Sequence, residues 1–140
     1  MRLYGPVGAR NFPADRNPTT IAVGTGRLSV AGGGSSNSGV YVAPAGRRAV
    51  LNYDVEQTVT AALAAGQNAN LTIAFTPSGG AQTTVAEGGL PGASAIGVTK
   101  RLSGTVQLKP GDQVTGLLTL TAGAGASDLA GGLQGVEYDS

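Results

Sequence analysis

The stretch TVQLKPGDQV, residues 105–114, constrains the fold more than any other part of the chain. Polar and apolar residues alternate on both sides of Lys109-Pro110-Gly111-Asp112, as in strands that rest one face on a core. Proline fixes φ near the value needed at the second position of a type II turn, and glycine accepts the positive φ needed at the third. The stretch therefore predicts a β-hairpin.

The same alternation recurs along most of the chain. Its longest run covers residues 47–59, and the residues expected on its inward face are Ala49, Leu51, Tyr53, Val55 and Val59. Shorter runs cover residues 20–23, 27–31, 40–42, 71–76, 82–86, 95–102, 104–108, 113–121 and 133–138. Residues 59–67 are rich in alanine, but this run is short, so we expect a strand end that enters a loop, with a single helical turn as the alternative. About eight to ten strands with closely spaced turns predict an all-β sandwich or barrel.

Composition excludes several classes of function. The net charge is +1 and 12% of residues are charged, so the chain lacks the basic patch that nucleic-acid binding requires. No apolar run approaches the about 18 residues of a membrane span, and the N-terminus lacks the apolar segment of a signal peptide. The absence of cysteine and histidine removes thiolate and imidazole chemistry. We expect no enzyme activity, cofactor or metal, and no nucleic-acid or membrane partner.

The sequence divides into three regions. Residues 1–18 contain three prolines and show no periodicity, so they predict an extended N-terminal arm that could reach about 60 Å and order against a neighbouring subunit. A frayed terminus is the alternative. Short β segments and a Gly/Ser-rich linker are expected over residues 19–39, and the sandwich body over residues 40–140. The candidate binding residues of the arm are Arg2, Leu3, Tyr4, Val7, Arg10, Phe12 and Arg16.

Two groups of acidic residues are candidate sites. Asp54 and Glu56 share one face of a strand at about 7 Å, a spacing that could serve glycoside hydrolysis or Ca²⁺ binding. Asp128, Glu137 and Asp139 would gather to bind Ca²⁺ if the loop 122–132 folded back. In both cases we prefer an ordinary solvated surface, because no aromatic platform accompanies the first group and the spacing of an EF-hand is missing from the second.

Two basic pairs, at residues 47–48 and 100–101, flank predicted strands. They could meet acidic side chains, Asp112 among them, across a subunit boundary and so select partner and register. The alternative is that they protect strand ends against unwanted edge pairing. The residues predicted for contacts between subunits are Arg47, Arg48, Asp54, Glu56, Lys100 and Arg101.

Three stretches near the C-terminus carry a resemblance to a known family. SGTVQLKPGDQV (103–114) has a strand–turn–strand pattern Leu-x-x-Gly-Asp-x-Val, LLTLTA (117–122) resembles the strand that follows, and LQGVEYDS (133–140) resembles a closing strand. RAVLNYDVEQTV (48–59) is similar to an earlier strand. Together they resemble the trimeric jelly roll of the C1q and TNF-like proteins, an architecture that also occurs in bacteriophage head-decoration and fibre proteins. The resemblance implies a jelly-roll-like antiparallel β-sandwich that forms a homotrimer.

The chain has little bulk with which to build a core alone. It contains two Phe and no Trp, so packing against identical copies would add the apolar area that a lone domain lacks. Together with the resemblance to bacteriophage head-decoration proteins, this leads us to expect a structural virion protein, made in the host cytoplasm and placed on the capsid exterior. It would be a decoration or cement protein that binds and stabilises the major capsid shell as a homotrimer.

Two other functions remain open from the sequence. The alternative is a phage fibre or adhesin head domain that binds a host glycan or receptor, for which Tyr41 and Tyr138 are the candidate exposed aromatics. An enzyme that depends on Asp54 and Glu56 ranks last.

Overall fold

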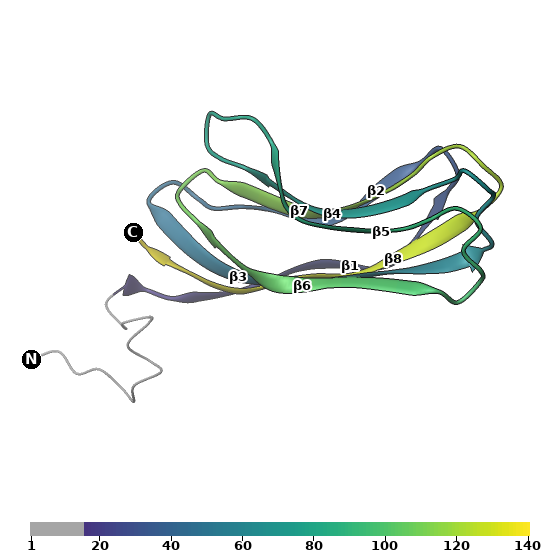
Figure 1. Ribbon diagram of the computed structural model, residues 1–140. Coiled ribbons are helices and arrows are strands. Elements are labelled where there is room, and N and C mark those ends of the chain that lie inside the picture. The colour runs from purple at the N-terminus through teal and green to yellow at the C-terminus, as the bar shows by residue number, and fades with distance from the viewer. Residues whose placement is uncertain (1–15) are drawn as a thin grey trace, which may run out of the picture.

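The computed structural model describes residues 16–140, which form two four-stranded antiparallel sheets packed face to face (Figure 1). The strands are β1 (Thr19–Ala31), β2 (Ser35–Val42), β3 (Arg47–Ala61), β4 (Ala69–Thr76), β5 (Thr83–Leu90), β6 (Thr99–Leu108), β7 (Gln113–Leu120) and β8 (Ala126–Asp139). Within this part of the chain, no helix is long and apolar enough to cross a membrane. The prediction of an all-β antiparallel sandwich is confirmed.

The strand order identifies the sandwich as a jelly roll. One sheet has the order β1-β8-β3-β6 and the other β2-β7-β4-β5. Successive strands alternate between the sheets, apart from β4 and β5, which pair with each other. An eight-stranded double sheet with this crossing pattern is a jelly roll. We call β1-β8-β3-β6 the long-strand sheet, since its strands hold 10 to 15 residues, and β2-β7-β4-β5 the short-strand sheet, since each of its strands holds 8.

The turn at residues 109–112 forms as predicted, but the hairpin does not. The Asp112 amide donates to the Lys109 carbonyl oxygen at 3.0 Å, and Gly111 has φ +86°, as a type II turn requires. However, β6 pairs with β3, whereas β7 pairs with β2 and β4, so the turn links the two sheets. Local residues fix the turn, whereas the choice of strand partner depends on the whole sandwich.

The sandwich begins earlier than the sequence indicated. The segment predicted as short β runs and a linker, residues 19–39, forms β1 and most of β2. β1 pairs with β8 along its whole length, with one bulge between Thr25 and Leu28. The linker is shorter than predicted, because residues 32–34 form a turn and residues 35–39 belong to β2. A ladder of backbone hydrogen bonds does not need bulky side chains. Gly39 even favours the packing, since a Cβ there would lie 2.9 Å from Val23 Cγ1.

Other boundaries differ by a few residues. The two runs at 95–102 and 104–108 form one strand, β6, and the weak run at 82–86 becomes β5. β3 ends at Ala61 and a loop follows, so the preferred interpretation of the alanine-rich segment is confirmed.

The core is built largely from leucine. The alternation predicted for β3 is confirmed, with Ala49, Leu51, Tyr53, Val55 and Val59 buried. The leucines with 0% or 1% exposure are Leu51, Leu71, Leu108, Leu118, Leu120, Leu129 and Leu133, which come from both sheets. Gln57 lies on the same inward face of β3 with 0% exposure, and neither polar atom of its amide has a partner among the described residues.

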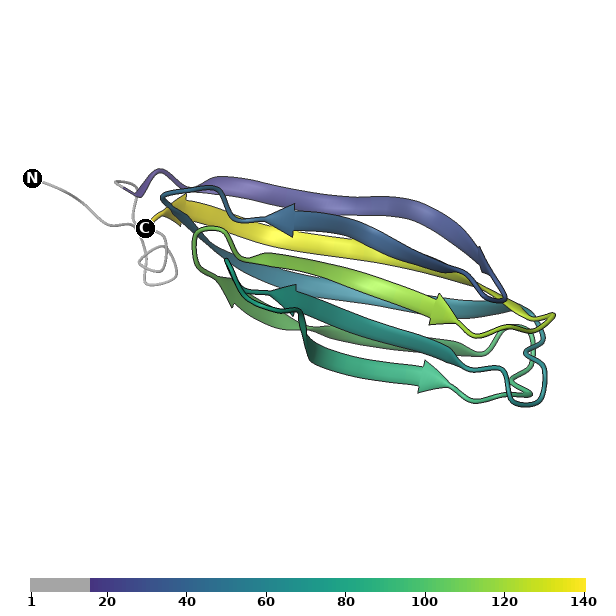
Figure 2. The same cartoon turned by 90° about the horizontal axis from the view of Figure 1, so that it is seen from above.

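The connections gather at the two ends of the sandwich. Residue Ser140 and the start of β1 lie at the end that holds the β2–β3, β4–β5 and β6–β7 connections (Figure 2). At this end, the Asp112 carboxylate accepts hydrogen bonds from the backbone amides of Ser78 and Lys109, at 3.0 and 2.9 Å. At the other end, the buried Gln67 amide bonds the backbone of residues 64, 121 and 125. Each end is thus held by a buried polar side chain.

Candidate interaction surfaces

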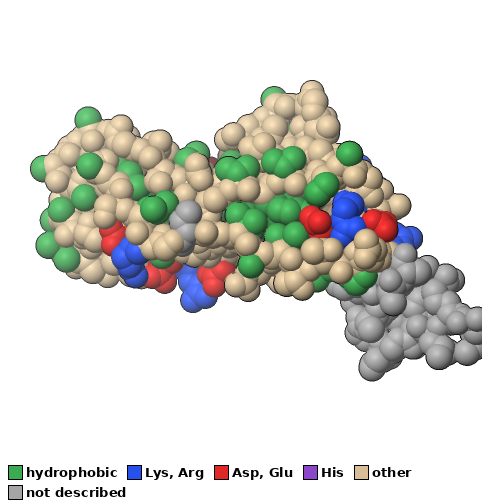
Figure 3. All heavy atoms as spheres, turned by 180° about the vertical axis from the view of Figure 1, so that it is seen from behind, with side chains coloured by type: hydrophobic (Ala, Val, Ile, Leu, Met, Phe, Trp, Pro, Cys, Tyr) green, Lys and Arg blue, Asp and Glu red, His purple; other side chains and the backbone are tan. Residues whose placement is uncertain are grey.

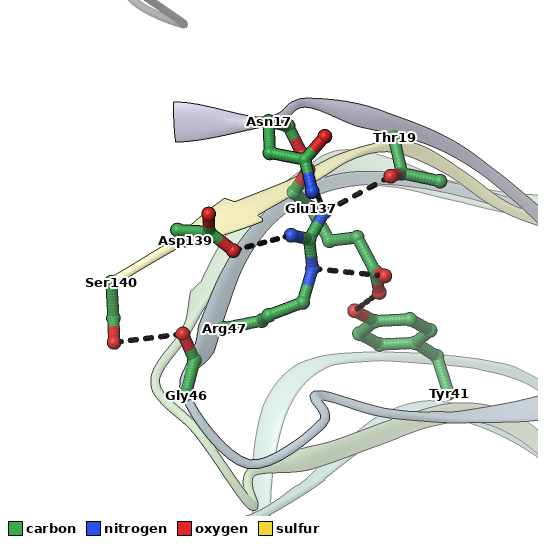
Figure 4. A network of polar contacts seen from close by, with 8 residues as sticks. All are labelled: Asn17, Thr19, Tyr41, Gly46, Arg47, Glu137, Asp139 and Ser140. Carbon is green, nitrogen blue, oxygen red and sulfur yellow. Dashed lines mark hydrogen bonds and ion pairs between the residues drawn. The ribbon is translucent and has the colours of Figure 1, made fainter. Parts of the chain in front are cut away.

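Arg47, the first residue of β3, joins segments that lie far apart in the sequence (Figure 4). At the end of β8, its Nε is 3.2 Å from Glu137 Oε1 and its Nη1 is 2.6 Å from Asp139 Oδ1. Near the start of β1, its Nη2 donates to the Asn17 carbonyl oxygen at 2.8 Å and to Thr19 Oγ1 at 3.0 Å. The Arg47 side chain is 15% exposed. This Arg47 cluster fixes the point at which the chain enters the sandwich.

Tyr41 connects the Arg47 cluster to the opposite sheet. Its hydroxyl donates to Glu137 Oε2 at 2.6 Å (Figure 4). Burial of the ring and the hydrogen bond to the Glu137 carboxylate raise the pKa of Tyr41 well above its ordinary value, because both disfavour the phenolate. The prediction that Tyr41 is an exposed aromatic is wrong, since the alternation of β2 turns it into the core at 6% exposure.

Most candidate residues of the predicted arm lie outside the described residues. They are Arg2, Leu3, Tyr4, Val7, Arg10 and Phe12. Arg16, the last of the set, is exposed and lies next to Asn17, which the Arg47 cluster holds. The contacts predicted for the arm therefore stay predictions.

Asp54 forms an ion pair within its own chain. Arg101 donates from Nε to Asp54 Oδ1 at 2.7 Å and from Nη2 to Asp54 Oδ2 at 2.6 Å, across the β3–β6 pair. These hydrogen bonds hold the pKa of Asp54 below its ordinary value. The general acid of a glycosidase needs a raised pKa, so Asp54 does not fit that role. A contact of either residue across a subunit boundary stays a prediction.

The other charged residues predicted for subunit contacts lie on the same sheet. Arg48 and Lys100 are exposed and Glu56 is partly buried. The side chain of Lys100 runs close to Gly88 of β5, where an added Cβ would lie 2.6 Å from its Cε. Their roles between subunits stay predictions.

The acidic residues of β8 do not gather. Asp128 lies near the start of the strand and Glu137 and Asp139 near its end, about 30 Å away at about 3.3 Å per residue. Asp128 instead accepts a hydrogen bond from Ser29 at 3.1 Å and pairs with Arg27 at 3.5 Å. The prediction that the loop 122–132 folds back is wrong, because residues 126–139 form one strand. Among residues 16–140, no group of three or more potential ligands is arranged for a metal ion.

A shallow hollow of ≈ 600 Å³ lies over β1, β8 and β3 on the long-strand sheet. Small residues form part of its lining, namely Ala22, Gly24, Gly131 and Gly132. Asn52, Asp54 and Gln134 add amide and carboxylate groups. This lining can hydrogen-bond a ligand but pairs no nucleophile with a base.

Charge is distributed unevenly between the two sheets, a feature that sequence reasoning missed. The charged residues on the long-strand sheet are Arg27, Arg47, Arg48, Asp54, Glu56, Lys100, Arg101, Asp128, Glu137 and Asp139. The strands of the short-strand sheet carry one, Glu87 on the edge strand β5. Figure 3 shows charged side chains along the side of the long-strand sheet. The sequence held the signal, but only the assignment of each strand to a sheet makes it visible.

These features define the class of the chain, a jelly-roll sandwich with one charged and one nearly uncharged sheet. No family model matches the sequence, and no curated protein does. Among solved structures, the chain is similar to Eiger TNF from S. frugiperda, with 12% identity and a TM-score of 0.48 over 88% of this chain and 92% of that one. It is also similar to infectious bursal disease virus Gt strain, with 14% identity and a TM-score of 0.46 over 87% of this chain.

A further similar structure is the VP2 subviral particle of infectious bursal disease virus, with 13% identity and a TM-score of 0.45 over 87% of this chain. The chain spans about one third of the length of these viral chains, 33% and 32%. At this identity and TM-score, none of these likenesses bears on function.

Proposed function

We propose that the chain is a structural protein of a viral particle, a capsid decoration or cement protein on the exterior of the virion. It binds the major capsid shell as a homotrimer and stabilises it. The arm, residues 1–18, anchors the protein by strand addition and apolar contacts, and its arginines pair with acidic groups of the shell.

The Arg47 cluster is the observation that carries this proposal. It ties the chain at Asn17 and Thr19 to β3 and β8, so that a pull on the preceding residues passes directly into the sandwich. An anchor that holds a body on a particle needs such a firm attachment.

A binding experiment with particles tests the anchor. Particles assembled from the major capsid protein of the genome that encodes this chain are sedimented with the intact protein or with a variant that lacks residues 1–18. The intact protein should co-sediment and the truncated one should remain in solution. Replacement of Arg2, Arg10 and Arg16 by Gln should weaken binding, whereas Lys109→Gln, at an exposed cation of the body outside the predicted contacts, is the control.

Two results would count against the proposal. If the intact protein does not bind the particle, the cement function is wrong. If the truncated protein binds as tightly as the intact one, the function stands but the arm is not the anchor.

The hollow on the long-strand sheet favours a second candidate, a fibre or adhesin head domain that binds a host glycan. Asn52, Asp54 and Gln134 are the hydrogen-bonding groups that such a site would use. A glycan array with clear hits that disappear on Asn52→Ala and Gln134→Ala would place this function first. An array without hits leaves the cement function as the better proposal.

A further inference from the structure

The outer face of the short-strand sheet combines low charge with exposed apolar side chains. Val40 and Val42 of β2 are 44% and 49% exposed, and Val85 of β5 is 44% exposed. Leu117 of β7, whose register partners are Asn37 and Thr72, also turns outward and is partly buried. Protein interfaces are depleted in charge at their centres, so this face fits one.

We propose that this face packs against a second copy of the same chain and so forms the contact of the homotrimer. The inference deepens the trimer part of the proposed function and rests on it. It assigns the contact to β2, β7, β4 and β5 and leaves the charged outer face of the long-strand sheet in solvent, in place of the subunit contacts predicted from the sequence for the charged residues of β3 and β6.

The chemistry of the face suits an identical partner. Apart from its valines and Leu117, it presents threonine, asparagine and glutamine side chains, including Thr72, Asn70 and Gln113. Hydroxyl and amide groups both donate and accept hydrogen bonds, so such a surface complements itself. A partner recognised through charge would find only Glu87 on these strands. Two copies meeting here remove few charges from water, which keeps the desolvation penalty small.

The size of the face limits each contact. Four strands at about 4.8 Å and eight residues at about 3.3 Å cover about 500 Å². Side-chain relief increases this area, and so does the β4–β5 connection, which projects outward above the sheet (Figure 1). The whole face is of the order of the about 800 Å² per partner of a typical specific interface, and a three-fold ring divides it between two neighbours. We therefore expect a trimer that dissociates on dilution.

The two edges of the face differ, which permits a ring rather than a face-to-face dimer. The β2 edge carries Val40 and Val42, whereas the β5 edge carries Glu87 and Gly89 beside Val85. In a three-fold ring each copy meets its two neighbours through different parts of the same surface. The apolar β2 edge of one copy would then lie against the β5 side of the next.

The test compares charged substitutions on the two outer faces. Leu117→Lys and Val50→Lys are matched, because both replace a partly buried, outward apolar residue on a central strand. Val40→Lys is a second test on the proposed face, at a side chain already exposed enough not to affect folding. The mass of each full-length variant is measured by sedimentation velocity over a range of concentrations, without particles, and folding is checked by thermal unfolding.

We expect the unmodified protein and Val50→Lys to sediment as trimers. Leu117→Lys and Val40→Lys should dissociate to folded monomers, with dissociation constants raised at least about 100-fold, because each removes an ammonium group from water at a contact that was apolar. Trimers that survive both substitutions on the short-strand sheet, or that dissociate on Val50→Lys alone, would overturn the inference. So would an unmodified protein that is monomeric at all concentrations.

Particle binding separates this inference from the function itself. Folded monomers of Leu117→Lys that still bind particles weakly would support both the assignment of the trimer contact to this face and the cement function. If Leu117→Lys stays trimeric but no longer binds particles, the face contacts the shell and the inference is wrong while the function stands. If the trimer dissociates as expected but the intact protein binds no particle, the assignment of the trimer contact to this face is correct and the cement function is wrong.

Discussion

Buried polar side chains at the ends of the sandwich and within its paired strands differ in their hydrogen bonding. At the ends, Asp112, Gln67 and the Arg47 cluster are all hydrogen-bonded, largely to backbone groups of loops or strand ends. Within the paired strands, Gln57 is as deeply buried as Gln67, yet neither atom of its amide has a partner among the described residues. The difference lies in what surrounds each side chain rather than in residue type.

Backbone pairing explains this difference. β3 is bonded to β6 on one side and to β8 on the other, so the peptide groups around Gln57 already have partners. Loops leave peptide groups unpaired, and those groups must find side chains when they are buried. Polar side chains therefore stabilise the ends, whereas a buried amide within the paired strands finds no partner and destabilises the core.

The largest expected effect is at the Arg47 cluster. Arg47→Met should lower the free energy of unfolding by about 3 kcal/mol, because Glu137 stays 14% exposed and loses its cationic partner. Urea unfolding at neutral pH measures the change. Arg48→Met, an exposed neighbour, is the control and should change stability by less than about 0.5 kcal/mol. Equal effects of the two would show that the cluster adds nothing specific to this end.

The next largest effect on the free energy of unfolding is expected for Gln67→Leu. The substitution leaves the amides of Ala64 and Gly125 and the carbonyl of Thr121 without their side-chain partner, which should destabilise the chain by about 2 kcal/mol. Hydrogen exchange at residues 64 and 125 should rise more than exchange in β3. A loss spread evenly over the sandwich would contradict a local role.

Tyr41→Phe should lower the free energy of unfolding by about 1.5 kcal/mol at neutral pH, since the hydroxyl donates a hydrogen bond to the Glu137 carboxylate. The folded pKa of Tyr41 is raised, so its stabilisation is complete below the unfolded pKa of about 10 and is lost as pH rises from there toward the folded value. The difference between the unmodified protein and the Tyr41→Phe variant in urea unfolding should therefore shrink above about pH 10. A difference that stays constant well into the alkaline range would contradict the shift.

The smallest effect has the opposite sign. Gln57→Leu removes an unpaired amide from the core at similar volume and should stabilise the protein by about 1 kcal/mol. Thermal unfolding measures the gain, and Gln67→Leu serves as the matched control because it replaces the same residue type at similar burial. A loss of stability at position 57 would show that its amide has a partner after all and would remove the contrast with the ends.

Local features were predictable from the sequence. The type II turn at 109–112, the inward face of β3 and the all-β class depend on alternation and on the φ preferences of Pro110 and Gly111. Gln57 was missed, although its position two residues after Val55 places it on the inward face, because a polar residue breaks the pattern that identifies such faces. Tyr41 was misplaced for a similar reason, since a short run of three apolar residues does not show which of them faces inward.

The sequence by itself determined which residues extend, where the chain turns and which side chains alternate, since these follow from neighbouring residues alone. Only the tertiary structure decided that β6 and β7 separate into different sheets, that Arg47 meets β1 and β8, and that all but one of the charged residues in the strands fall on one sheet. Each of these depends on strands that are distant in the chain becoming neighbours. Such pairing follows from the closure of the whole sandwich around its core, a global balance that no short stretch encodes.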